Sequence, residues 1–380
     1  MKSHHLKYLL LFTSLIFSIA VIAPPPVEGA PSRDKRKLAK LKKETRKLKR
    51  TLRSIASQLA EARRPVPIPK PFMEMVTVGN PGNPDDPSDG DGSTVDVENF
   101  GHVPYVFQIG KYEVTLQQYT AFLNAVAATD TYDLYRTNIG THPHVAGIAR
   151  SGGSGNYTYS VIGSGKHPVT NVTWFDAARF CNWLHNGRPN GAQDETTTED
   201  GAYTLLGAQT GTPERNWGAR CWIPSENEWY KAAYFHPHNE GGPADSYWLY
   251  PTGSDDVPGN LIGNLPNQAN HRTPDNLYAA TRRTATEDTN YLLDAGIFEG
   301  TAGFFGTFDM GGSVFEWNDA VIVDMDGTKR GLRGGSWFSH EGRLRSSKRD
   351  AGLLDREGNV IGFRIAGPEL NCLHELPDLD

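Results

Sequence analysis

The stretch from Arg333 to Ala366, RGGSWFSHEGRLRSSKRDAGLLDREGNVIGFRIA, constrains the fold more than any other part of this 380-residue chain. It opens with a Gly-Gly-Ser-Trp turn and closes with a short apolar Gly-Phe-Arg-Ile-Ala segment. The residues between these ends are too rich in Arg, Ser, Asp and Gly for a core strand, so we expect two buried strand ends that hold a long irregular loop at the surface. Loops held on a rigid frame commonly carry binding or catalytic residues.

Charge divides the chain into a basic arm and an acidic body. Residues 33–64 contain 14 Lys and Arg against 3 Asp and Glu, whereas residues 65–380 contain 22 against 40. Residues 1–30 begin with positive side chains and continue into an apolar run, Tyr8–Ile22, which is typical of a signal peptide. The run is short for a membrane span, although an uncleaved anchor is the alternative. We therefore expect a secreted, periplasmic or cell-envelope protein.

Residues 31–64 carry apolar side chains at alternating spacings of three and four, which predicts a basic coiled-coil helix. The seam consists of Leu38, Leu41, Thr45, Leu48, Leu52, Ile55 and Leu59. The pattern favours self-association through residues 38–59. A solitary solvated helix and a basic arm on an anionic surface are the alternatives, and export argues against a nucleic-acid partner. Residues 65–71 form a stiff Pro-rich linker, and residues 368–380 are read as a tail.

The body, residues 72–367, predicts an α+β domain with few regular elements and long connections. Three capping boxes predict helix starts: Thr115 with Gln118, Thr173 with Asp176, and Ser225 with Glu228. Short strands are expected within Phe72–Val78 and Val103–Tyr112. No periodic element is evident in the long polar stretches Thr129–Gly165, Asn186–Arg220 and His236–Asn270.

The chain has three cysteines, Cys181, Cys221 and Cys372. An odd number without a Cys-x-x-Cys pair predicts neither a disulfide framework nor a zinc site. The pairing of these three residues stays open at this point.

Six motifs follow one another in a fixed order: IGKYEVTLQQYTAFLNAV, HPVTNVTWFDAARFCNWL, WIPSENEWYKAAYF, NQAN, FGTFDMGGSVFEWND and RGGSW…GFRIA. Together they resemble the formylglycine-generating enzyme family, also called sulfatase-modifying factor. The same superfamily includes ergothioneine-type sulfoxide synthases and pyoverdine-maturation proteins. The resemblance extends over residues 72–367 and implies a loop-rich variant of the C-type lectin fold.

The motif around Asp309 predicts a calcium site. Asp309 and Glu316 offer hard carboxylate oxygens, and the intervening glycines allow backbone carbonyls to converge on one centre. The resemblance implies structural calcium held by the side chains of Asp309 and Glu316 and the carbonyls of Gly312 and Val314. It also implies a second calcium site that uses Asn270 and the carbonyl of His271. The alternative is a capped turn whose two acids are solvated.

Copper is not expected. The resemblance implies two copper-binding cysteines in the loop that follows the Gly-Gly-Ser turn, but the matching positions are Ser339 and Leu344. Copper(I) prefers soft thiolates, which neither residue provides. The sulfoxide-synthase branch uses a His-x3-His-x-Glu iron motif that this sequence lacks.

The loop remains suited to binding through Trp337, Ser339, His340, Arg343 and Arg345. Arginine pairs with anions in a bidentate manner and stacks on rings, which fits a peptide, a protein or a small anionic ligand. A core Trp337 with arginines paired to the acidic body is the alternative. We expect an exported, calcium-stabilised ligand- or protein-binding module. The alternative function is an oxidoreductase of the same superfamily that acts on a thiol or peptide substrate with another metal centre.

Overall fold

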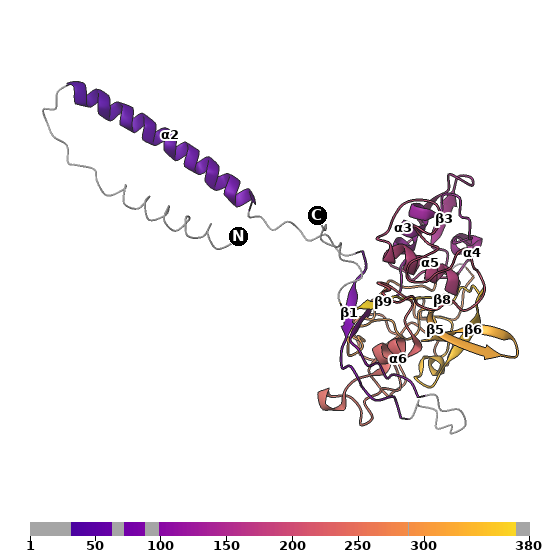
Figure 1. Cartoon of the computed structure of the whole chain (residues 1–380). Coiled ribbons are helices and arrows are strands. Elements are labelled where there is room, and N and C mark those ends of the chain that lie inside the picture. Colours follow the sequence, from indigo (N-terminus) through magenta and orange to yellow (C-terminus); the bar gives the residue numbers. More distant parts are fainter. Residues whose placement is uncertain (1–31, 63–71, 88–98, 288, 370–380) are drawn as a thin grey trace. The chain divides into compact units, whose positions relative to one another are not determined.

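The computed structural model describes residues 32–62, 72–87, 99–287 and 289–369, and the chain divides into two compact units, Met1–Lys70 and Pro71–Asp380. The expected signal peptide, the linker and nearly all of the expected tail therefore lie outside the described residues (Figure 1). Among the helices that are described, none is long and apolar enough to cross a membrane.

The first unit contains helix α2, Ser32–Ala62, where the sequence predicts a helix. Three leucines of the expected seam face solvent: Leu41 is 63% exposed, Leu48 66% and Leu52 41%. An isolated helix gains nothing from these side chains, whereas a second helix packed on the seam would bury them. The helix is confirmed, and its coiled-coil pairing stays a prediction.

Leu48→Glu is expected to weaken self-association of the full chain at least about tenfold, because a charge in a short heptad seam must be desolvated. Sedimentation velocity over a concentration series measures this change. Lys47→Gln alters the net charge equally at a neighbouring position outside the seam and should leave association unchanged. An unchanged oligomeric state in Leu48→Glu would show that the seam does not pair.

Three longer helices in the second unit begin where their capping boxes place them. They are α3 (Leu116–Val126), α5 (Trp174–His185) and α6 (Glu226–Tyr234). In each case the cap side chain accepts the N3 backbone N–H, and the N3 side chain accepts the N-cap N–H, as the sequence predicts. These signals are local, so the sequence alone locates the helix starts.

Three small sheets connect distant segments. Strands β1 (Met75–Val78), β2 (Phe107–Gly110) and β9 (Ala366–Pro368) form an antiparallel sheet in that order. Strands β3 (Ile148–Ser151) and β4 (Thr158–Val161) form a hairpin. The third sheet has the order β7-β6-β5-β8, with β5 at Phe315–Asp324, β6 at Gly327–Arg333, β7 at Asp350–Leu353 and β8 at Ile361–Gly362. The β5–β6 hairpin projects from the body, while α3, α4, α5 and β3 gather at one end (Figure 1).

The structure corrects two expectations about irregular segments. Thr129–Gly165 contains helix α4 (Thr137–Thr141) and the β3–β4 hairpin, whose strands are too short and polar to show a period. The segment Arg333–Ala366 is not a single irregular loop, because it contains the 3-10 helix η2 (Glu341–Leu344) and strand β7. Strand β7 lies at the edge of its sheet, so it needs no continuous apolar run.

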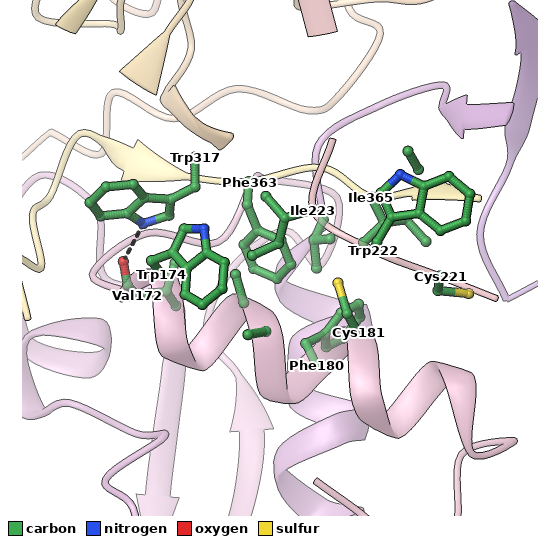
Figure 2. Close-up of a cluster of buried hydrophobic side chains, with 14 of the residues drawn as sticks. Val172, Trp174, Phe180, Cys181, Cys221, Trp222, Ile223, Trp317, Phe363 and Ile365 are labelled. Atoms are coloured by element: carbon green, nitrogen blue, oxygen red, sulfur yellow. Dashed lines mark hydrogen bonds between the residues drawn. The ribbon is translucent and has the colours of Figure 1, made fainter. Parts of the chain in front are cut away.

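The core is rich in aromatic side chains that come from all parts of the domain. Figure 2 shows Trp317 of β5 beside Trp174 at the start of α5, with Phe180 farther along the same helix, and the indole N–H of Trp317 donates to the Val172 carbonyl at 3.0 Å. Cys181 and Cys221 are both buried in the same cluster. Ile365, which precedes β9, packs into the same cluster. Cys372 lies outside the described residues.

Buried ion pairs brace this core. Three arginines that are at most 1% exposed each bind a buried glutamate: Arg179 with Glu199, Arg333 with Glu226, and Arg364 with Glu316. The three donor–acceptor distances are 2.8, 2.8 and 2.6 Å. Removing one partner of such a pair leaves an uncompensated charge in the interior, which costs several kcal/mol.

Candidate functional site

The segment that follows β6, residues 336–345, is called the 336–345 loop below, and both of its ends are fixed. It follows Gly334 and Gly335, whose φ angles are +95° and +74°. A Cβ atom at Gly334 would lie 2.8 Å from the Met310 carbonyl oxygen, so the turn requires glycine there. Arg333, just before the loop, donates from Nη1 to the carbonyls of Ser346 (2.7 Å) and Lys348 (3.2 Å), just after it. This arginine therefore ties the two ends of the loop together.

Trp337 supports the loop from beneath. It is 2% exposed, its ring stacks on Tyr291 with centroids 4.9 Å apart and planes 7° apart, and its Nε1 donates to the Asn359 carbonyl. The expectation that Trp337 offers its ring to a ligand is therefore not met, because Tyr291 and the body cover it. Phe338 is the exposed aromatic residue instead, at 52%, with the guanidinium of Arg272 lying 5.2 Å from its ring centroid.

Ser339 and Leu344 are both occupied within the protein. The half-buried Ser339 accepts from the Ser336 backbone N–H through Oγ at 3.1 Å, and the two serine hydroxyls lie 3.1 Å apart. Leu344 is fully buried in a small cluster with Tyr250 and Ala269. One position thus holds a hydroxyl that braces the loop, and the other holds an apolar packing residue.

The solvent side of the loop is basic. His340 and Arg343 are exposed, and Arg343 forms an ion pair at 3.5 Å with Asp350 of β7. Arg345 lies over the ring of Tyr250 at 5.7 Å. Phe338, His340 and Arg343 together make an exposed aromatic and basic edge.

The backbone of the expected calcium segment forms a tight turn. Asp309, Gly312 and Ser313 all have positive φ angles, of +56°, +80° and +56°. A Cβ atom at Gly312 would lie 2.3 Å from the Asn270 carbonyl oxygen, and Ser313 N–H donates to that same oxygen. Asp309 Oδ2 accepts the Gly296 N–H at 2.6 Å. The structure therefore brings Asn270, expected in the second site, directly beside the first.

Glu316 binds other side chains of the protein, whereas the resemblance implies that its carboxylate binds calcium. Its carboxylate accepts from Arg364 Nε at 2.6 Å and Nη2 at 2.7 Å, and from Trp229 Nε1 at 2.7 Å. Both oxygens thus have strong charge-assisted partners, and binding a cation directly would require Glu316 to give up some of them. Val314 is fully buried next to this residue.

Some of the atoms that are expected to bind a second calcium ion already have partners within the protein. The His271 carbonyl accepts from Asn260 Nδ2 at 3.0 Å, and the His271 Nε2 atom lies 3.0 Å from the Pro258 carbonyl. The Asn270 amide donates to the Tyr291 carbonyl at 3.2 Å. These contacts give both residues a structural role in holding the 258–291 region.

A buried carboxylate that the sequence reading missed lies at Glu113. It is 2% exposed, and neither oxygen has a hydrogen-bond partner among the described residues. Burial first, and then the charge of Asp309, raises the pKa of Glu113 well above its usual range. Burial likewise raises the pKa of Asp309 to about 6. Glu113, Asp309 and Glu316 thus share a region with one guanidinium, that of Arg364.

Comparison with protein families gives one match: residues 92–368 fit the sulfatase-modifying factor enzyme 1-like domain. The chain belongs to this family. No curated protein matches the sequence significantly. Among solved structures, this sulfatase-modifying-factor-like domain is similar to CarF, with 21% identity, a TM-score of 0.40, and coverage of 78% of this chain and 98% of that one.

Two further solved structures are similar at a comparable level. Variable protein 1 of Treponema denticola is 17% identical, with a TM-score of 0.39 and coverage of 77% and 94% of the two chains. PvdO from Pseudomonas aeruginosa is 17% identical, with a TM-score of 0.38 and coverage of 78% and 92%. These similarities are distant, and membership of the family rests on the family match.

In this sulfatase-modifying-factor-like domain, no local signal points to Glu113. Strand β2 ends at Gly110, and Lys111, which shares the parity of the core residues Phe107 and Ile109, is only partly buried, so alternation does not extend to the acid. Among the described residues, no group of three or more His, Cys, Asp or Glu side chains converges closely enough for a metal ion. A cation in this region would therefore depend on backbone carbonyls as well as carboxylates.

Proposed function

We propose that this domain is a calcium-stabilised binding module of an exported protein, and that it does not carry out copper-dependent oxidation of a thiol. The binding surface is the exposed edge of the 336–345 loop, and its ligand is a peptide, a protein or a small anionic molecule.

The observation that carries the proposal is the chemistry at positions 339 and 344. A copper(I) centre needs two soft thiolates at these positions. Ser339 uses its hydroxyl to hold Ser336, and Leu344 packs in the interior with no atom that can bind a metal. Both positions stabilise the loop, which favours a fixed surface over a redox centre.

Charge balance supports calcium. Glu113, Asp309 and Glu316 bring three carboxylates into the interior around the single guanidinium of Arg364. When all are ionised, the group has an excess of two negative charges, which a bound divalent cation neutralises. The two unpartnered oxygens of Glu113 and the turn at Asp309–Ser313 fit such an ion. Asp309, the carbonyls of Gly312 and Val314, and Glu113 would hold it, while Glu316 stays with Arg364.

The exposed edge supports binding. Phe338 is 52% exposed and leaves a ring on a surface that is otherwise polar. Arg272 lies 5.2 Å from its ring centroid, and the exposed His340 and Arg343 follow it in the loop. Aromatic and arginine side chains often contribute most of the binding energy at protein interfaces. The apolar run in residues 1–30 supports export, since it has the length of a signal peptide.

Metal analysis of the purified full chain, combined with oxygen uptake on a cysteine-containing peptide, tests the proposal. We expect stoichiometric calcium, copper and iron at trace level, and no oxygen uptake, because the soft ligands are missing. Stoichiometric copper or iron together with oxygen uptake on the thiol peptide would establish the oxidoreductase alternative and overturn the proposal.

A further inference from the structure

The connection that precedes α6 contains a tryptophan, Trp217, that does not pack in the core. Trp217 is 102% exposed. Together with Tyr105, Arg215 and Trp222 it lines a surface hollow of about 380 Å³. No residue of the 336–345 loop lines this hollow. An exposed indole adds nothing to the folded core, yet its full apolar area is available to a ligand.

The floor of the hollow is rigid because one buried carboxylate organises it. Glu228 is completely buried and accepts from Tyr105 Oη at 2.8 Å, from Arg215 Nη1 at 3.2 Å and from Trp222 Nε1 at 3.0 Å. The Arg215 guanidinium also stacks over the Trp222 ring at 4.4 Å. Burial, and then the charge of Glu228, raises the pKa of Tyr105 to about 12, so the phenol keeps its proton and continues to donate. The walls are therefore fixed before any ligand arrives.

The donors and acceptors that are not used within the protein determine which kind of ligand the hollow can bind. Tyr105 and Trp222 both direct their donors to Glu228, so neither can donate to a peptide carbonyl. The phenol oxygen of Tyr105 accepts from Arg215 and keeps one further lone pair, and a guanidinium has five N–H donors, of which the Glu228 and Tyr105 contacts use two. An adjacent acceptor and donor match hydroxyl groups, which donate and accept at once. Glu228 also neutralises Arg215, so the hollow favours a neutral ligand over an ion.

We propose that this hollow is a carbohydrate-binding site, in which the apolar face of a neutral pyranose ring stacks on Trp217 and its hydroxyls bond to Tyr105 and Arg215. A sugar ring has the required combination of one C–H-rich face and a rim of hydroxyls. The site is independent of the binding surface proposed above, because the two share no residue.

The test uses the full chain on an array of neutral and acidic glycans, followed by calorimetric titration with the neutral oligosaccharide that is retained best. Trp217→Ala should lower the affinity at least tenfold and leave the melting temperature unchanged, because the side chain is fully exposed. Tyr105→Phe, which keeps the ring and removes the oxygen, should weaken binding less than Trp217→Ala. Phe338→Ala, an exposed aromatic residue of the 336–345 loop, should bind like the wild type.

Three results would overturn this assignment: no neutral glycan is retained at millimolar concentration, Trp217→Ala binds as well as the wild type, or a proline-rich peptide binds in place of the glycans and depends on Trp217. Loss of glycan binding in Phe338→Ala, with Trp217→Ala unaffected, would assign the sugar to the loop instead. In that case the binding function proposed above survives and this hollow does not carry it.

Discussion

Replacing Arg364 by methionine is expected to lower the free energy of unfolding by about 3–5 kcal/mol, the cost of breaking a buried ion pair from one side. Arg364 is completely buried and donates four hydrogen bonds to three groups: the Glu316 carboxylate through Nε and Nη2, the Gly110 carbonyl at 2.8 Å, and the Phe308 carbonyl at 3.0 Å. It thereby joins β2, the segment that contains Phe308 and the chain before β9. Urea unfolding followed by fluorescence measures the loss.

The double variant Arg364→Met/Glu316→Met is the control, and it should lose less stability than Arg364→Met alone because no unpaired charge remains at Glu316. In EDTA, the loss in Arg364→Met should also shrink as the pH falls. Burial raises the pKa of Asp309 to about 6 and that of Glu113 well above its usual range, so acid protonates both carboxyls in the folded state before it does so in the unfolded chain. Folded pKa values above the unfolded ones mean that stability is gained as the pH falls through them. The charge of Arg364 lowers both pKa values, so they rise further in Arg364→Met and the variant gains more stability than the wild type. A loss that is small, or equal at pH 8 and pH 5, would contradict this role for Arg364.

Calcium at a hundred times its dissociation constant is expected to stabilise the wild type by about 2.7 kcal/mol, the amount that mass action gives for one site that forms only in the folded protein. For a domain of this size, the melting temperature should rise by about 4 °C. Differential scanning calorimetry in calcium and in EDTA measures the shift. Magnesium should give a smaller one, because it dehydrates reluctantly and demands octahedral geometry.

Glu113→Gln separates a ligand from a structural residue. In EDTA this variant should be at least as stable as the wild type, because the wild type must either bury an unpartnered charge at Glu113 or bind a proton there on folding. In calcium the order should reverse, and Asp309→Asn should likewise lose most of the calcium-dependent shift. Asp326→Asn, at an acid whose side chain is 78% exposed in the β5–β6 turn, serves as the matched control and should respond like the wild type. An undiminished calcium shift in Glu113→Gln and Asp309→Asn would rule out this site.

The sequence predicts those parts of the fold whose causes are local. Each capping box joins residues three positions apart, so Thr115, Thr173 and Ser225 identify helix starts without any tertiary information. No local pattern predicts strand β7, because this strand forms only by pairing with β6. The hairpin β3–β4 is missed for the same reason.

The candidate site shows the same limit. Trp337 is covered by Tyr291, which is 46 positions earlier in a region without recognisable motifs, so no local pattern predicts its burial. Glu316 binds Arg364 across 48 positions, and Arg333 binds Glu226 across 107. The residue types at 339 and 344, by contrast, are read directly from the sequence, and they already argue against a thiolate copper centre.

The hydrogen bonds by which Arg333 connects the two ends of the 336–345 loop have an evolutionary consequence. Because this buried side chain bonds to carbonyls on the far side of the 336–345 loop, the ends of the loop are held by main-chain atoms that every amino acid possesses. The exposed residues between them, Phe338, His340 and Arg343, can therefore be exchanged during divergence at little cost to folding. In such an arrangement, the codons that are needed for folding are separate from the codons that can change and alter what the loop binds.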